Sequence, residues 1–127
     1  MRILLIDDDP QVRLTLVAFL ERAGHDVQAL EHARQLQARV QQRPDIAFVD
    51  VFMPDVDGFQ TLKTLRAMLP QVPVVMISGG GLCLGACLPM ATRLGAEAVL
   101  QKPVTRAALL DAVDSLTGRP ASPDAQP

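Results

Sequence analysis

Five short apolar runs are spaced along the chain, and most are followed by a segment with a helix-like pattern. We expect the runs to be β-strands, at residues 3–6, 27–30, 46–49, 74–77 and 98–100. Most are unbroken aliphatic stretches, which is typical of parallel strands buried on both faces. Strands that alternate with helices predict an α/β fold, in which helices cover both faces of a parallel sheet.

The segments between the runs carry apolar residues at helical spacing, and prolines and glycines mark several of their ends. Pro10 opens the first segment, because a proline there lacks only an N–H that would have no helical partner, and Gly24 ends it. Pro44 and Pro70 follow the second and third segments. We expect five helices, at residues 10–23, 33–40, 59–69, 86–94 and 105–116.

Length and composition limit the classes of function. At 127 residues the chain is one domain in size, and it is 49% hydrophobic but only 3% aromatic, so few side chains are suited to base stacking. A net charge of −2, without a run of Lys or Arg, argues against direct binding of nucleic acid. No stretch has the length and apolar character of a signal peptide or a membrane span, and we expect a cytoplasmic protein.

Polar residues follow four of the five predicted strands at the point where each strand ends. They are Asp7, Asp8 and Asp9 after the first strand, Asp50 after the third, Ser78 after the fourth and Lys102 after the fifth. Ligands of doubly wound sheets bind at the carboxyl ends of the strands, so we expect these side chains to meet at one edge.

Carboxylates gathered at one edge repel one another unless a hard cation lies among their oxygens. Mg²⁺ suits one or two carboxylates together with water and phosphate oxygens. Such a cation would also offset the charge of an arriving phosphoryl group, which Lys102 and Ser78 could contact. Asp50 would then have the surroundings that a carboxylate nucleophile needs, and the sequence predicts a Mg²⁺-dependent phosphoryl-transfer site.

The chain resembles the receiver domains of two-component response regulators, including the stand-alone chemotaxis type. The stretches that carry the resemblance are Ile3-Leu-Leu-Ile-Asp-Asp-Asp-Pro10, Phe48-Val-Asp-Val-Phe-Met-Pro-Asp-Val-Asp-Gly58, Ser78-Gly79, Gly95-Ala96 and Lys102-Pro103. The resemblance covers residues 1–117, which we expect to form one receiver domain, followed by a disordered tail at residues 118–127. It implies a flavodoxin-like, doubly wound sheet of five parallel strands in the order 2-1-3-4-5, flanked by five helices.

The resemblance also implies how the acidic residues act. Asp50 would accept a phosphoryl group from the phosphohistidine of a histidine kinase. Asp8, Asp50 and the backbone carbonyl of Phe52 would bind Mg²⁺ directly, and Asp7 would assist through water. For Asp9 two interpretations stay open: it assists the metal through water in the same way, or it only caps the helix that follows.

The remaining motif residues receive roles in the same way. Ser78 would move to meet the phosphoryl group, and Lys102 would contact that group. The peptide bond between Lys102 and Pro103 would be cis, and Gly58 would form the turn after the phosphorylation loop.

Three departures from the family pattern lead to further hypotheses. Val99 stands where many receivers carry a Tyr or Phe ring that turns inward on activation, which puts switching by that ring in doubt. The segment Gly79–Met90 is long, glycine-rich and apolar, and it either forms part of a partner or dimer surface or packs as a buried irregular helix. Phe52 and Gly80 lack side chains that could orient a hydrolytic water, so we expect slow loss of phosphate.

Three other functions fit parts of the sequence. A phosphatase of the haloacid-dehalogenase type would use the Asp-x-Asp within residues 7–9, but Gln11 stands where that family has Thr. A flavodoxin-like FMN binder needs a first loop rich in Ser, Thr and Gly, and here that loop is acidic. A degenerate receiver would bind partners without phosphorylation, although all the site residues are present.

The resemblance implies signalling partners rather than a substrate that is turned over. The phosphodonor would be a sensor histidine kinase or a phosphotransfer protein, and the output would be a downstream protein or domain. The face formed by helix four, strand five and helix five would bind a partner or form a homodimer. The chain would be either a stand-alone receiver or the front of a longer regulator, without direct contact to nucleic acid or membrane.

Overall fold

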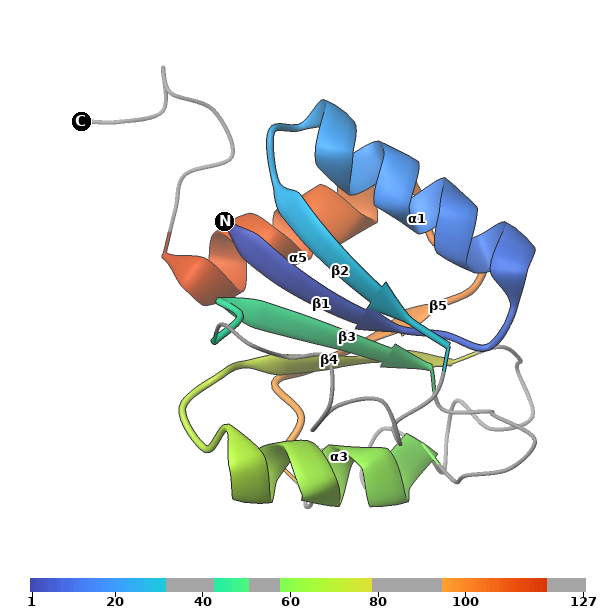
Figure 1. Ribbon diagram of the computed structural model, residues 1–127. Helices are drawn as coiled ribbons and strands as arrows, with labels where there is room; N and C mark the ends of the chain where they lie inside the picture. The colour runs from blue at the N-terminus through green and yellow to red at the C-terminus, as the bar shows by residue number, and fades with distance from the viewer. Residues whose placement is uncertain (32–42, 51–57, 79–94, 119–127) are drawn as a thin grey trace.

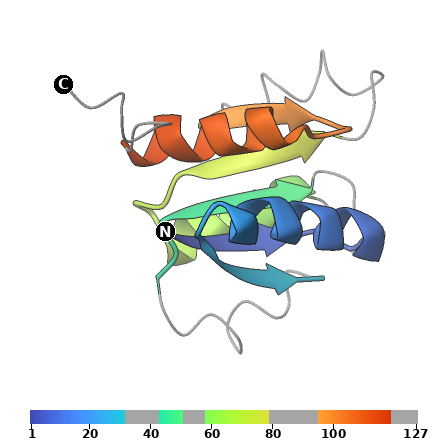
Figure 2. The same cartoon turned by 90° about the horizontal axis from the view of Figure 1, so that it is seen from above.

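The strands of the computed structural model, which describes residues 1–31, 43–50, 58–78 and 95–118, form a single sheet. All neighbouring strands are parallel, in the order β2-β1-β3-β4-β5, and their arrowheads point the same way in Figure 2. This arrangement confirms the predicted α/β fold and its strand order. The strands are β1 (Arg2–Ile6), β2 (Asp26–Leu30), β3 (Ile46–Asp50), β4 (Val74–Ser78) and β5 (Ala98–Gln101).

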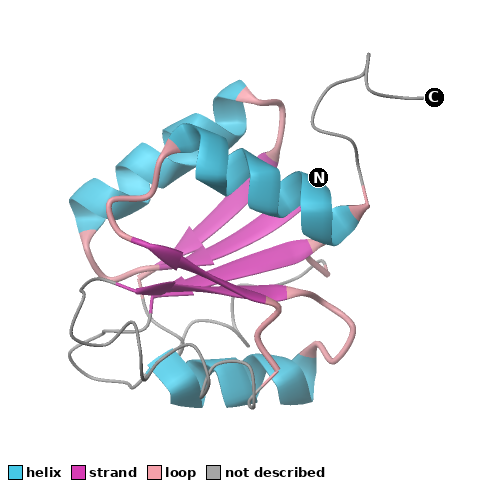
Figure 3. Ribbon diagram, turned by 180° about the vertical axis from the view of Figure 1, so that it is seen from behind, coloured by secondary structure: helices cyan, strands magenta, loops and turns pink. Residues whose placement is uncertain are grey.

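Helices lie on both faces of the sheet. Of those described, α1 (Pro10–Arg22) and α5 (Arg106–Thr117) cover one face, and α3 (Gly58–Met68) covers the other (Figures 1 and 3). The helices predicted at 33–40 and 86–94 lie outside the described residues, as does the tail from 119 onward. Within the described ranges, none of the helices has the length and apolar character that a membrane crossing needs.

The ends of α1 and α5 follow from side chains that the sequence supplies. Asp9 caps the amino end of α1, and Thr105 caps α5 by accepting a hydrogen bond from the Ala108 N–H at 3.1 Å. The last helix therefore begins at residue 106, one residue later than predicted, with Thr105 as its cap. Gly24 and Gly118 follow the two helices with φ of 90° and 76°, a left-handed conformation that glycine adopts without strain.

Alternate residues of the central strands face opposite layers of the core. In β1, Ile3 and Leu5 pack in the cluster that includes residues of α1 and α5, whereas Leu4 and Ile6 pack in the cluster that includes residues of α3. All four are at most 1% exposed, and full burial of such a side chain contributes about 2 kcal/mol. Packing on both faces therefore fixes the position of β1 between the two helical layers.

The strand register brings the carboxyl ends of four strands to one edge. Ile6 pairs with Val49, Asp50 pairs with Ile77, and Ser78 pairs with Gln101. The chain therefore leaves β1 at Asp7 and β5 at Lys102 beside the ends of β3 and β4. The edge of the sheet that the sequence indicated as the site is thus assembled by strand pairing alone.

Candidate functional site

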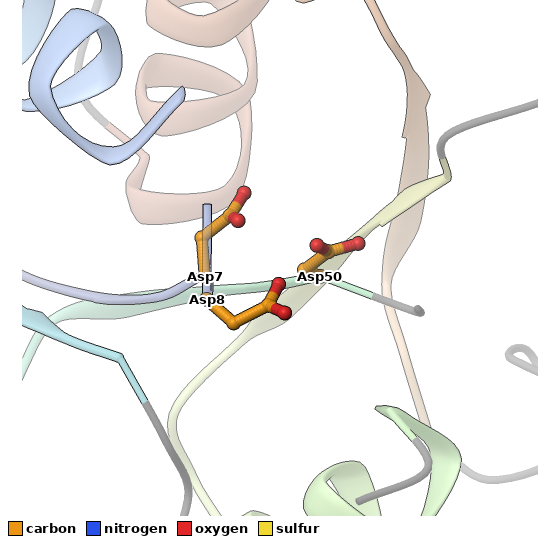
Figure 4. A group of neighbouring side chains, drawn as sticks. All are labelled: Asp7, Asp8 and Asp50. Atoms are coloured by element: carbon orange, nitrogen blue, oxygen red, sulfur yellow. The ribbon is translucent and has the colours of Figure 1, made fainter. Parts of the chain in front are cut away.

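Three carboxylates converge at the carboxyl edge of the sheet. Asp7 and Asp8 follow β1, and Asp50 ends β3; one oxygen of each lies within 4.8 Å of the others (Figure 4). Asp7 is 0% exposed and Asp50 is 2% exposed, whereas Asp8 is half-buried. Figure 4 shows the Asp8 carboxylate reaching across toward Asp50. The fold therefore brings the adjacent residues Asp7 and Asp8 together with Asp50, which lies far from them in the sequence.

Lys102 supplies the positive charge of this site from the end of β5. Its Nζ lies 3.2 Å from Asp50 Oδ2, as a hydrogen-bonded ion pair, and 3.4 Å from Asp7 Oδ2. Burial alone would lower the pKa of the Lys102 ammonium, but attraction by Asp50 and then by Asp7 outweighs burial and raises that pKa above its ordinary value. Lys102 therefore stays charged at neutral pH, beside both buried carboxylates.

The peptide bond that follows Lys102 is cis. The bond joins Lys102 to Pro103, as the resemblance implied, so this expectation from the motif is confirmed.

The charges of the site do not balance. Among the described side chains that meet at this edge, three carboxylates and one ammonium leave two negative charges. Two carboxylates about 5 Å apart repel by about 3 kcal/mol at an effective dielectric constant of about 20. Among the described residues, the buried Asp7 Oδ2 has the Lys102 ammonium, at 3.4 Å, as its one contact. A divalent cation would neutralise the excess, and an all-oxygen donor set suits Mg²⁺. The residues present therefore fit such an ion.

Ser78 places a hydroxyl at the same edge. The residue is 0% exposed, and within the described part of the chain its Oγ has no hydrogen-bond partner. Its backbone oxygen accepts a hydrogen bond of 2.8 Å from the Lys102 N–H, which joins the ends of β4 and β5. A buried hydroxyl without a partner costs about 1–3 kcal/mol, which indicates a group reserved for another ligand.

Asp9 is not one of the converging acids. Its Oδ1 accepts hydrogen bonds from Gln11 N at 2.9 Å and Val12 N at 3.4 Å, so it caps α1. Of the two interpretations that the sequence left open, the structure supports capping, because the carboxylate is directed at the helix and is exposed.

Arg13 belongs to the surroundings of the site and was missed by the sequence reasoning. Its Nη1 donates a hydrogen bond of 2.8 Å to the backbone oxygen of Asp7. A signal was present, because Arg13 is the fourth residue of α1 and a positive charge near a helix amino end is disfavoured by the helix dipole. A cation in that place indicates a specific acceptor nearby.

Several expectations lie partly or wholly outside the described residues. Val99 is described: it is half-buried and packs against the hydrophobic cluster on the α3 face. Gly58 is the first residue of α3. Phe52, Gly80 and the segment Gly79–Met90 are not described, so the backbone ligand, the slow loss of phosphate and the partner surface stay predictions.

The sequence matches a known family over most of its length. The family model described as response regulator receiver domain matches residues 3–114. The C4-dicarboxylate transport transcriptional regulatory protein DctD of Pseudomonas aeruginosa is 39% identical over 116 residues, which are 88% of this chain and 24% of DctD. A transcriptional regulatory protein CpxR homolog of Haemophilus influenzae is 30% identical over 96% of this chain and 52% of its own length.

Solved structures show the same architecture. A CheY-like response regulator receiver domain protein of Methanospirillum hungatei superimposes with a TM-score of 0.83 at 25% identity, over 92% of this chain and 93% of that one. The receiver domain of NtrX from Brucella abortus superimposes with a TM-score of 0.83 at 27% identity, over 91% and 98% of the two chains. The chain thus spans nearly all of these two receivers but about a quarter of DctD.

Proposed function

The chain belongs to the response regulator receiver domain family, and we propose that it is a phosphorylation switch whose phosphate-accepting residue is Asp50. Receiver domains of response regulators are signalling domains, not turnover enzymes. The observation that carries the proposal is the pairing of buried Asp50 with Lys102 at 3.2 Å inside a cluster of three carboxylates. The carboxylates of such a cluster repel one another unless a cation binds among them. Phosphoryl transfer to Asp50 would give each charged group a role.

The chemistry follows from the side chains at this edge. An Asp50 carboxylate oxygen attacks phosphorus, a P–O bond forms, and the bond from phosphorus to the donor's imidazole nitrogen breaks. Lys102 holds positive charge beside the accepting carboxylate throughout, and its raised pKa keeps it protonated. The Ser78 hydroxyl, which has no partner among the described residues, would donate a hydrogen bond to a phosphoryl oxygen. Lys102 and Ser78 would together orient the phosphoryl group and offset its charge.

A divalent cation completes the charge balance in this proposal. Asp8, Asp50 and the backbone carbonyl of Phe52 would hold Mg²⁺, and Asp7 would assist through water. When bound, Mg²⁺ supplies positive charge that offsets the repulsion between the phosphoryl oxygens and the carboxylates. Asp9 has no part in holding it, because its carboxylate is engaged with the helix end.

Signal transmission would begin at Ser78. When its hydroxyl turns toward the phosphoryl group, its backbone hydrogen bond to Lys102 N links that movement to the end of β5. The change would pass to the face formed by helix four, β5 and α5, which would control partner binding or homodimerisation. Val99 on β5 has no ring to turn, so movement of backbone and loops carries the signal in this account.

The partners follow from the same site. A sensor histidine kinase or phosphotransfer protein would present the phosphohistidine. A mostly apolar pocket lined by Val12, Thr15, Pro103 and Val104 also includes Lys102, and a donor protein seated there would lie beside Asp50. The receiver domain would span residues 1–117 with a tail at 118–127, and a downstream output domain or protein would respond. The cytoplasmic location expected for such a protein stays a prediction.

The test is phosphorylation by a small donor. The purified chain incubated with acetyl phosphate and Mg²⁺ should gain the mass of one phosphoryl group, and omission of Mg²⁺ should prevent the gain. Asp50→Asn should abolish it completely, since the amide is no nucleophile.

The matched control is Asp45→Asn, the same change at the opposite edge of the sheet, which should be phosphorylated like the original chain. Phosphorylation of Asp50→Asn to the same extent would contradict the proposal. A chain that folds and binds its partners with Asp50→Asn, and is never phosphorylated, would instead be a degenerate receiver.

A further inference from the structure

Asp7 makes four polar contacts, and one of them comes from a side chain of α1. Its N–H donates to Leu30 O at 3.1 Å, and its Oδ1 accepts from Asp9 N at 2.9 Å. Its Oδ2 faces Lys102 at 3.4 Å. Its backbone oxygen accepts from Arg13 Nη1 at 2.8 Å. Every polar atom of Asp7 has a partner, and Arg13 provides the one that reaches in from a helix.

The contacts of Arg13 and Asp9 close a ring between the acidic turn and α1. Asp9 has two hydrogen bonds to α1. Its carboxylate accepts one from Gln11 N, and its backbone oxygen accepts one of 2.9 Å from Arg13 N. The guanidinium of Arg13 then returns to Asp7 O. Residues 7 to 9 are therefore attached to the first turn of the helix at both ends, and Asp8 lies between the two attachments.

We propose that Arg13 is a positioning residue that fixes the direction of the Asp7 and Asp8 carboxylates and so strengthens cation binding at the site. The inference rests on the proposed function only in that a divalent cation binds there. Arg13 itself touches neither cation nor phosphoryl group in this account. It acts through the backbone of Asp7, as groups behind metal ligands commonly orient those ligands.

Two effects of Arg13 on the cation have opposite sign. Its positive charge repels a divalent cation, so removing the charge would tighten binding. Its hydrogen bond keeps the turn in the geometry that the carboxylates need, so removing the bond would weaken binding. Loss of a group that orients metal ligands typically weakens binding by about 10–100-fold. We expect the positional effect to be the larger one, so loss of Arg13 should weaken cation binding and not tighten it.

The experiment measures Mn²⁺ affinity of the full chain by electron paramagnetic resonance, with Mg²⁺ as a competitor. Arg13→Ala should weaken Mn²⁺ binding by about tenfold, the lower end of the range, because Arg13 acts on the backbone and not on a ligand atom. Arg13→Lys keeps the charge but loses the planar fork, and should weaken binding by about threefold. Arg22→Ala removes the same charge from an exposed position at the other end of α1, and should change nothing.

Unfolding measured without metal separates positioning from a general loss of structure. Unchanged or tighter Mn²⁺ binding in Arg13→Ala overturns the proposal, and so does a lower stability without any change in affinity. If Arg13→Ala does not fold, Arg13→Lys decides alone, and unchanged affinity in that variant is the contrary result. If the original chain binds no Mn²⁺, both the role of Arg13 and the cation site of the proposed function are wrong. If the original chain binds Mn²⁺ and the Arg13 variants bind it equally well, only the role of Arg13 is wrong.

Discussion

The two edges of the same sheet use their acids in different ways. At the amino edge, Glu97 accepts a hydrogen bond of 2.6 Å from the N–H of Val74, and Asp45 accepts one of 2.8 Å from the N–H of Arg2. Each acid accepts a hydrogen bond from the first residue of the strand beside its own: Glu97 precedes β5 and accepts from β4, and Asp45 precedes β3 and accepts from β1. At the carboxyl edge, Asp8 and Asp50 converge instead on each other and on Asp7. Acids at one edge stabilise the sheet, and acids at the other repel one another.

Each edge also contains an interaction between opposite charges, and the two interactions differ in burial and in the number of acids. Arg66 lies 3.5 Å from Glu97 and both side chains are partly exposed, so this ion pair contributes at most about 1 kcal/mol. Lys102 is shared by two buried carboxylates. One ammonium does not balance the carboxyl edge, so stability alone does not explain why these acids are gathered there. Cation and phosphoryl binding does explain it.

The largest effect that would sharpen this contrast is on cation binding. Asp8→Asn should weaken Mn²⁺ binding on the order of hundredfold, or about 3 kcal/mol, because a charged oxygen ligand is replaced by a neutral one. The metal-free protein should become more stable to urea by about 1 kcal/mol, since repulsion between carboxylates is relieved and water screens part of the gain.

Asp45→Asn is again the matched control, because it makes the same chemical change at the amino edge. It should leave Mn²⁺ affinity unchanged. A metal-free Asp8→Asn that is clearly less stable than the original chain would show that the acidic cluster is not strained, and the contrast between the two edges would break.

The next effect concerns the amino edge and should leave the chemistry untouched. Glu97→Ala removes the acceptor of the buried Val74 N–H, and the free energy of unfolding in urea should fall by about 2 kcal/mol. Glu97→Gln keeps an acceptor oxygen and should lose less. Both variants should be phosphorylated by acetyl phosphate at the original rate, and a large loss of that rate in the folded variants would show that the two edges are coupled.

The smallest effect compares two hydroxyl groups. Ser78→Ala removes a buried hydroxyl without a described partner, and the free energy of unfolding should rise by up to about 1 kcal/mol, because the cost of burying that hydroxyl is removed. Thr105→Ala removes the cap of α5 and should cost about 1 kcal/mol. Urea unfolding of both measures the difference. If Ser78→Ala is the more destabilising of the two, the Ser78 hydroxyl stabilises the folded protein and is not available to a phosphoryl group.

The sheet and the meeting of Asp7, Asp8, Asp50 and Lys102 were predictable because they depend on strand order alone. Residues that follow parallel strands share an edge, wherever they stand in the sequence. The sequence left the role of Asp9 undecided between assisting the metal and capping the helix, since the choice depends on the backbone angles at that residue, φ −82° and ψ 113°, which aim its carboxylate at the helix.

Contacts that depend on the path of a long side chain were also beyond the sequence. Arg13 reaches back six residues to a backbone oxygen, and Glu97 reaches Val74 across 23 residues through the register of β4 and β5. Apolar periodicity contains no information on either path. The unfavourable position of a cation near the start of α1 was the one signal that could have indicated the Arg13 contact.

The central claim is that Asp50, and not a neighbouring acid, accepts the phosphoryl group. The most direct test is to treat the chain with acetyl phosphate and Mg²⁺, reduce the acyl phosphate with borohydride, and locate the resulting homoserine by peptide mass spectrometry. We expect homoserine at residue 50, and none at Asp7 or Asp8 although both lie in the same cluster. Homoserine at Asp7 or Asp8, or no reduction product at any aspartate of the phosphorylated chain, would contradict it.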